Sequence, residues 1–360
     1  MTRILIASLL LGYVGSGLAL AADKVLGDEL APPRPVAAKH WEKPFSPDTC
    51  TIVGAYMTMV RTGPDKYAAF VNTWGKLTDG LEMWTGTSLG NFKSDGVVVA
   101  NSQIDDLPDK KTGKPYPKRC ITRPFIDWHP DHGFVGIVHV CRDYMPVDRR
   151  VYPALVTSKT GKGGTWKYHG RLKGEIWNEF GDDAKKHVHS DGGGFFYQPD
   201  KPAGLNRENP LENRYVFFTS HYSSWGAVNI LFSNDGKNWV FYRDAKGKII
   251  NLIPALAGKG MIFPHVVKLG KNGWSMTLSE RWPPVAIWRL WSPDGLNWQL
   301  VGQQPEIIEP KGLFVKNLSQ WYDPKTGLLH GYLTVRSAKP DGSMQSNKYR
   351  SQTRVFTGRE

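Results

Sequence analysis

The densest set of side chains that could do chemistry lies between His187 and Asp191, in the sequence His-Val-His-Ser-Asp. Alternate residues of a strand project from one face, so His187, His189 and Asp191 would lie side by side. His187 and His189 could hold a divalent cation, although no cofactor is required for the chemistry expected below. Alternatively, His189 could be a general base oriented by Asp191. A hydrogen-bonded loop without chemistry, beside the glycines at 192–194, is the third interpretation.

Two further carboxylates stand at comparable places in the chain. Glu280 follows a strand-like segment, and Asp48 precedes the first one. Two carboxylates about 5–10 Å apart suit the hydrolysis of a glycosidic bond. We therefore expect the catalytic groups among Asp48, His189, Asp191 and Glu280. The alternative for Glu280 is an ion pair with its neighbour Arg281.

Aromatic, basic and imidazole side chains at the ends of other expected strands could contact a substrate. Indole rings stack on the apolar faces of sugars, and guanidinium groups bind anionic groups. The expected substrate-binding residues are Trp74, Arg123, His221, Trp225, His265, Arg281, Trp282 and Arg336. The alternative for most of the 14 tryptophans is a place in the core.

These residues are positioned by strands, because helical periodicity is scarce and strand-turn-strand patterns recur. Five hairpins are predicted, each followed by one or two more strands. They span residues 51–73, 121–140, 191–220, 262–279 and 315–335, and each turn is rich in glycine, proline or aspartate. The starts of the first strands and the ends of the second strands should meet at one mouth of a ring. We therefore expect His189, Asp191, His221, His265 and Glu280 to meet there with at least one arginine.

An internal repeat divides the chain into units. Residues 233–239 and 292–298 share the pattern Ser-x-Asp-Gly-x-Asn-Trp, and a weaker copy begins at Ser158 and ends at Trp166. Asp-Gly between strands marks a tight turn, since glycine adopts positive φ at no steric cost. The repeat predicts an all-β fold: a single five-bladed β-propeller of four-stranded antiparallel blades.

The repeated turns, together with strand phrases such as Pro264-His265-Val266-Val267, resemble the five-bladed propeller glycoside hydrolases, which include arabinanases, xylosidases and fructosidases. The resemblance covers most of the chain and implies a carbohydrate-cleaving activity. The Arg-Asp-Pro catalytic signature of that family is not found, and the nearest phrase runs from Arg123 to Asp127. The catalytic residues of the family are therefore not transferred to this chain.

The hairpin at 119–143 also predicts a disulfide bond. If it turns at residues 129–133 so that Asp127 faces Phe134, Cys120 faces Cys141 across an antiparallel pair, at a separation that suits a disulfide. The third cysteine, Cys50, would remain unpaired.

The N-terminus predicts export to the periplasm or outside the cell. A charged residue, Arg3, precedes an apolar stretch at 4–14 and a small-residue run ending near Ala21. We expect a signal peptide at 1–21, a linker or surface strap at 22–47 and the propeller at 48–360. A retained anchor is the alternative, and no membrane span is expected after the signal is removed.

The net charge and the absence of nucleic-acid-binding motifs indicate which classes of molecule the protein could bind. The net charge of +13 attracts anionic glycans or surfaces, and the alternative is that a basic protein merely suits its habitat. The chain lacks any recognised nucleic-acid-binding motif. The expected protein is a monomer that cleaves glycosidic bonds of a polysaccharide, with an anionic one favoured by the charge. Two alternatives remain: a polysaccharide lyase acting on uronic acids, and a propeller that binds glycans or surfaces without catalysis.

Overall fold

The computed structural model describes residues 52, 55–72, 80–106, 112–115, 119–142, 151–175, 190–221, 227–256, 260–280, 286–302, 305, 307–308, 313–338 and 344–353. The expected signal peptide and linker lie outside these residues. Within them, no helix is long and apolar enough to cross a membrane.

The described chain is built from antiparallel strands in sequence order, which confirms the all-β prediction. The first sheet contains β1 (Ala55–Gly63), β2 (Lys66–Asn72), β3 (Gly80–Gly86) and β4 (Phe92–Ala100). The second contains β5 (Arg119–His129), β6 (Gly133–Arg142), β7 (Val151–Ser158) and β8 (Lys167–Arg171). The last contains β19 (Leu313–Asp323), β20 (Leu328–Ala338) and β21 (Met344–Thr353).

A ten-stranded sheet lies between the second and the last. Its first half is β10 (Ser190–Tyr197), β11 (Tyr215–His221), β12 (Val228–Ser233) and β13 (Asn238–Phe241), with β9 (Lys173–Gly174) at the edge. Its second half is β14 (Met261–Lys268), β15 (Trp274–Glu280), β16 (Ala286–Ser292), β17 (Gln299–Leu300) and β18 (Ile307–Ile308). A parallel pairing of Gly193 with His265 joins the halves. The described sheets therefore number four, and the count of five four-stranded blades stays a prediction.

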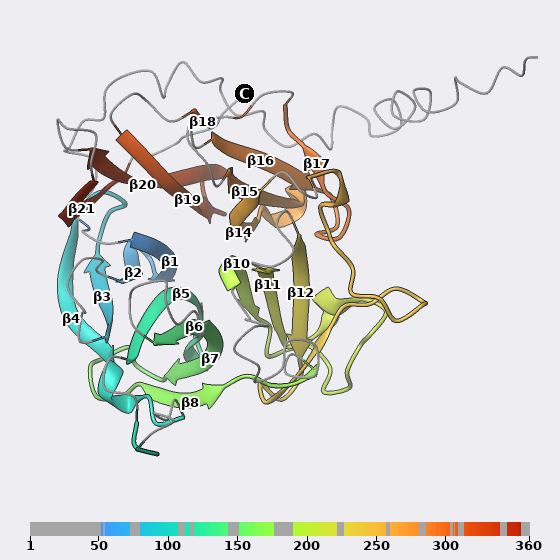
Figure 1. The fold of residues 1–360 in the computed structure, drawn as a ribbon, viewed down its shortest axis with the longest axis horizontal. Coiled ribbons are helices and arrows are strands. Elements are labelled where there is room, and N and C mark those ends of the chain that lie inside the picture. Colours follow the sequence, from blue (N-terminus) through green and yellow to red (C-terminus); the bar gives the residue numbers. More distant parts are fainter. Residues whose placement is uncertain are drawn as a thin grey trace, which may run out of the picture.

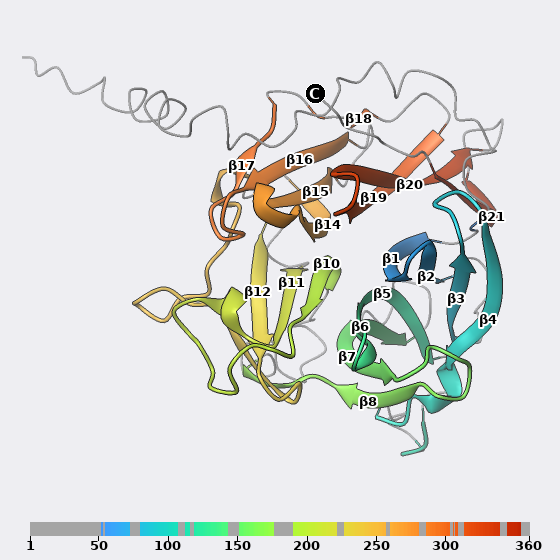
Figure 2. The same ribbon diagram turned by 180° about the vertical axis from the view of Figure 1, so that it is seen from behind.

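The sheets surround a common centre, with the first strand of each hairpin innermost (Figure 1). These first strands are β1, β5, β10, β14 and β19, and the view from behind shows β4, β8 and β17 on the rim (Figure 2). Each first strand is tied to the next. Thr58 Oγ1 donates to Pro124 O at 2.6 Å between β1 and β5, and Tyr197 N donates to Asp127 Oδ2 at 2.8 Å between β10 and β5. The Gly193–His265 pair joins β10 to β14, and Gln320 N donates to His265 Nδ1 at 3.1 Å between β19 and β14. The Arg61–Asp323 ion pair, at 3.7 Å, joins β1 to β19.

The hydrophobic core is divided among the gaps between consecutive sheets. Phe70 and Val138 belong to one cluster between the first two sheets, and Phe125 and Phe217 belong to the next. Another cluster joins Met59 of β1 to Trp321 and Tyr332 of β19 and β20. The aromatic-rich strands therefore bury both faces, which explains their nearly continuous apolar pattern.

The repeated turns are structural, as expected. In two copies the tryptophan Nε1 donates to the glycine carbonyl: Trp239 to Gly236 at 3.0 Å and Trp298 to Gly295 at 2.9 Å. Both glycines have positive φ, and the serine and aspartate of each copy hydrogen-bond within the turn. Trp166 donates to Gly161 in the degenerate copy at 2.8 Å.

In the β5–β6 hairpin Cys120 pairs with Cys141, as predicted, but the register next to the turn differs from the prediction by one residue, because Asp127 faces Val135 and not Phe134. The extra residue of the β5 bulge between Thr122 and Phe125 restores the cysteine pairing. The Sγ atoms of the two cysteines are 2.8 Å apart, and both side chains are buried. The structure contains no S–S bond between them, so the disulfide itself stays a prediction.

Candidate functional site

All five first strands carry one extra residue at the same level. The register shifts occur between Ala55 and Thr58, Thr122 and Phe125, Ser190 and Gly193, Ile262 and His265, and Val315 and Asn317. β-Bulges of this kind bend a strand and redirect a side chain, and they are frequent beside active sites. Each bulge begins with one residue of its strand. In β1, β5, β10, β14 and β19 these residues are, respectively, Tyr56, Arg123, Asp191, Phe263 and Lys316.

Three of these residues have left-handed backbone conformations. The φ angles are 54° at Tyr56, 46° at Arg123 and 54° at Phe263. Such a conformation costs roughly 1–3 kcal/mol for a bulky residue and is retained where the surroundings enforce it. The strain is therefore concentrated at one level of the central axis.

The same three side chains are in contact across the axis. The Arg123 guanidinium lies 5.1 Å from the centre of the Tyr56 ring and 5.7 Å from that of Phe263. The two rings are 5.4 Å apart and tilted by 51°. We call this set the bulge cluster. It combines a cation with aromatic faces, and these are groups that bind the polar edges and apolar faces of a sugar ring.

The strand register places several predicted residues near this level. Glu280 is opposite Met261 at the start of β14, and its side chain is half-buried. The backbone of His221 is opposite Ser190, and that of Arg336 is opposite Phe314. These pairs all lie where a first strand begins and a second strand ends. Asp191 occupies the β10 bulge.

Other predicted residues lie outside the described part of the chain, and their roles stay predictions. They are Asp48, Trp74, His187, His189, Trp225, Arg281 and Trp282. Among the described residues, no group of three or more His, Cys, Asp or Glu side chains could hold a metal ion.

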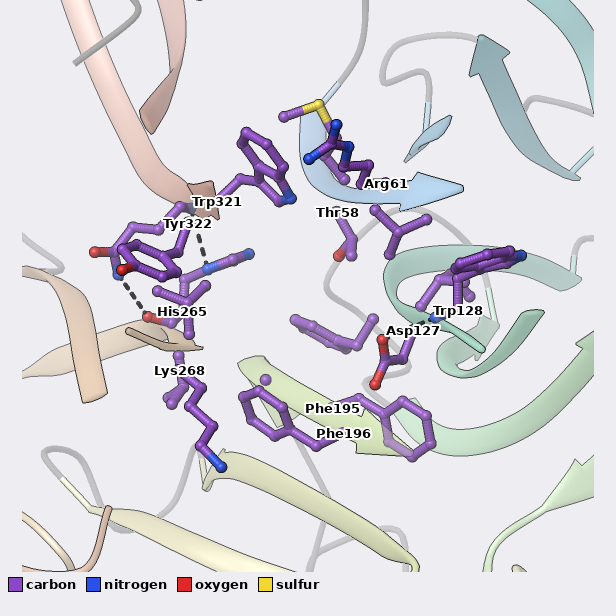
Figure 3. A pocket seen from close by; sticks show the side chains of 18 residues that line it. Thr58, Arg61, Asp127, Trp128, Phe195, Phe196, His265, Lys268, Trp321 and Tyr322 are labelled. Carbon is purple, nitrogen blue, oxygen red and sulfur yellow. Dashed lines mark hydrogen bonds between the residues drawn. The ribbon is translucent and has the colours of Figure 1, made fainter. Parts of the chain in front are cut away.

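Beyond the bulge cluster, toward the C-terminal ends of the first strands, lies a cavity of about 240 Å³ (Figure 3). All five first strands contribute to it, and we call it the axial cavity. Its walls include Arg61, Asp127, Trp128, Phe195, His265, Lys268 and Tyr322. The cavity is thus mixed in character, with aromatic surfaces and charges of both signs.

His265 belongs to the axial cavity rather than to the bulge level, although the sequence suggested the mouth. Its Nδ1 accepts the Gln320 N–H, so the neutral ring carries its proton on Nε2. Figure 3 shows the ring reaching into the cavity, with its far nitrogen toward the centre. Burial lowers the pKa of His265 to about 4. At neutral pH the residue is a neutral hydrogen-bond donor, not a base.

Asp127 is a cavity residue that the sequence did not identify as functional. Its carboxylate accepts the N–H groups of Tyr197 and Trp128, each at 2.8 Å. Burial raises its pKa to about 6, against the lowering effect of those two hydrogen bonds. The only signal in the sequence was its place beside Arg123 in the phrase compared with the hydrolase signature.

Comparison with known proteins identifies the fold. No protein-family model and no curated protein sequence matches the chain. An exo-β-1,3-galactanase from Clostridium thermocellum superposes with a TM-score of 0.56 at 14% identity, over 83% of this chain and 58% of that one. A β-1,3-galactosidase of glycoside hydrolase family 43 superposes with a TM-score of 0.53 at 16% identity, over 83% of this chain and 89% of that one. An N-acetylgalactosamine deacetylase from F. plautii superposes with a TM-score of 0.50 at 10% identity, over 88% of this chain and 90% of that one.

The chain therefore has a β-propeller fold like that of the glycoside hydrolases. At these identities the likeness concerns the fold. Since a galactanase and a deacetylase both resemble it, the chemistry has to be argued from the site of this chain.

Proposed function

We propose that this protein is an exported carbohydrate-active enzyme that hydrolyses glycosidic bonds of a polysaccharide. The reaction takes place at the mouth where the first strands begin, next to the bulge cluster. The observation that carries the proposal is the set of five bulges, which brings one residue of each first strand to the same level of the axis. The glycosidase activity of similarly folded proteins supports it.

The proposed catalytic groups are the carboxylates of this mouth. Asp191 occupies the bulge position equivalent to that of Arg123. Glu280 ends β15, which pairs with β14. One carboxyl group protonates the leaving oxygen while another activates water or attacks the sugar. Asp48 and His189 complete the proposed catalytic set.

The cations of the mouth give the substrate its proposed character. Arg123 at the bulge cluster, with Arg281 and Arg336, binds an anionic group of the glycan. Trp74, Trp225 and Trp282 offer stacking surfaces, and His221 donates hydrogen bonds. The net charge of +13 supports an anionic substrate, because it attracts such polymers over long range.

The proposal includes five blades. The hydrophobic clusters between consecutive sheets, and the polar contacts that link β1 to β5, β10, β14 and β19 in turn, support this count. Export to the periplasm or beyond and a monomeric state belong to the same proposal.

One observation removes a candidate base from the lyase alternative. In the lyase alternative a histidine takes the proton next to the carboxylate, and it needs an unprotonated ring nitrogen to do so. In His265 the Gln320 N–H occupies Nδ1, so the nitrogen that faces the cavity is protonated. His265 is therefore not that base, and a lyase would have to use His189 or His221.

An assay on a panel of neutral and acidic polysaccharides separates the three functions. New reducing ends and the absorbance of unsaturated uronates are followed together. Hydrolysis gives reducing ends alone, and a lyase gives both signals. A binding protein gives neither signal, and that result overturns the proposal.

A further inference from the structure

The axial cavity is separated from the proposed catalytic mouth by the bulge cluster. Its lining residues Thr58, Phe125 and His265 each come two positions after a bulge-cluster residue, Tyr56, Arg123 or Phe263. Because the three bulge-cluster side chains touch one another across the axis, they lie between the mouth and the cavity. The cavity is thus a second compartment of the axis, and it is bordered at the other end by Lys268, which is exposed, and by Trp128 and Tyr322, which are half-exposed.

The size of this compartment suits one small molecule. A water molecule needs about 10–15 Å³, and sites for drug-sized ligands occupy about 300–1,000 Å³. The cavity, at about 240 Å³, lies between these values. It has room for a single ring with its substituents, and a polysaccharide chain would not fit.

Its lining suits a neutral polyhydroxyl ring better than an ion. Asp127 reaches the cavity from β5, and the His265 ring enters from the opposite wall (Figure 3). One is a carboxylate with lone pairs beyond its two backbone contacts, and the other offers Nε2–H as a donor. Lys268 adds positive charge elsewhere on the wall, and the charge of Arg61 is paired with Asp323 at 3.7 Å, so no single sign of charge dominates.

Aromatic surfaces supply the remaining part of a sugar site. Trp128 and Tyr322 line the outer part of the cavity, and Phe195 and Trp321 line its walls. Apolar ring faces beside a few directed polar groups are the composition expected of a small-molecule site.

We propose that the axial cavity is a second, non-catalytic site that binds one neutral monosaccharide unit, between Trp128 at its outer end and His265 and Asp127 at its walls. This site is independent of bond cleavage at the mouth. Binding of a sugar product there would tie all five first strands together through one ligand.

The test is isothermal titration of the purified protein with D-galactose, D-xylose, L-arabinose and D-galacturonate. At least one neutral sugar binds, and D-galacturonate binds no more tightly than that sugar, because repulsion from Asp127 opposes the attraction of Lys268 for its carboxylate. Trp128→Leu keeps an apolar side chain against the core and removes the flat ring. It raises the Kd of the bound sugar at least tenfold. The matched control is Trp84→Leu, a half-buried tryptophan of an outer strand, which changes the Kd less than twofold.

A crystal of the wild-type protein soaked with the same sugar makes the test independent of the stability of the Trp128 variant. The proposal requires sugar density in the axial cavity within hydrogen-bond distance of His265 Nε2. Water alone in the cavity, sugar only at the opposite mouth, or failure of every neutral sugar to bind overturns it. Loss of hydrolysis with retained sugar binding, or the reverse, tells this proposal apart from the proposed function.

Discussion

The guanidinium group of Arg123 lies 5.1 Å from the centre of the Tyr56 ring, although the two residues belong to different sheets. Both residues have positive φ, and both occupy the first position of a β-bulge. Two separate strands therefore accept backbone strain in order to bring these side chains together. That relationship is the basis of the proposed site.

Replacing Arg123 with lysine tests the role of this contact. Lysine keeps the charge but loses the planar group that stacks on Tyr56 and Phe263 and forms paired hydrogen bonds. We expect kcat/KM on the best polysaccharide to fall at least tenfold, with an unchanged far-UV circular dichroism spectrum. The matched control is Arg207→Lys, an exposed arginine paired with Glu175, which keeps wild-type kinetics. Wild-type activity in Arg123→Lys would remove the arginine from the site.

The buried imidazole of His265 predicts a loss of stability in acid. Its folded pKa of about 4 is below the ordinary value of 6.5, so the unfolded chain binds the proton first. The contribution of His265 is complete above pH 6.5 and is lost as the pH falls toward 4, by up to about 3 kcal/mol. Urea unfolding of wild type and His265→Gln should give a difference that shrinks over this range. A difference that is constant with pH would show that the ring is not buried in its neutral form.

Asp127 predicts the opposite trend over nearly the same range. Its folded pKa of about 6 is above the ordinary 3.8, so the folded chain holds the proton more strongly. Its contribution is greatest below pH 3.8 and is lost as the pH rises past 6. The pKa difference sets an upper limit of about 3 kcal/mol on this loss. Because the side chain is half-buried, solvent screening keeps the loss below that limit. The unfolding free energy of wild type minus that of Asp127→Asn should therefore fall from pH 4 to pH 7.5. The exposed Asp105→Asn serves as control and should show no such trend.

The opposed thiols predict one disulfide in protein recovered from an oxidising compartment. Cys120 and Cys141 are register partners with Sγ atoms 2.8 Å apart. Mass spectrometry of a non-reduced digest should find them linked, and Cys120→Ser should lower the Tm only in the absence of reductant. A loop of this size stabilises by roughly 3 kcal/mol when closed. A bridge from Cys50 to either residue would contradict the prediction.

Local chemistry in the sequence was enough to predict the strands and their turns. The Asp-Gly turns of residues 233–239 and 292–298 form the same hydrogen bonds, and the β5–β6 hairpin turns at residues 129–133 as predicted. These features depend on neighbours in the chain, so the residue types alone specify them.

The contacts across the axis could not be predicted in the same way. A left-handed φ at Tyr56, Arg123 or Phe263 has no sequence signal, because glycine or asparagine is the usual marker of that conformation. His265 was placed at the mouth because it stands near the start of its expected strand, whereas the bulge between Ile262 and His265 comes first and His265 lines the cavity beyond it. Asp127 was missed because its hydrogen bond from the Tyr197 N–H and its place in the cavity depend on how two sheets meet.

The central claim is that glycosidic bonds are cleaved by the carboxylates at the mouth where the first strands begin. Its most direct test is the rate of reducing-end release by Asp48→Asn, Asp191→Asn and Glu280→Gln beside wild type. Glu212→Gln, at an exposed glutamate paired with Lys201, is the control. We predict that at least two of the three variants lose activity at least a hundredfold while their Tm values stay close to that of wild type. Wild-type rates in all three variants would contradict the account.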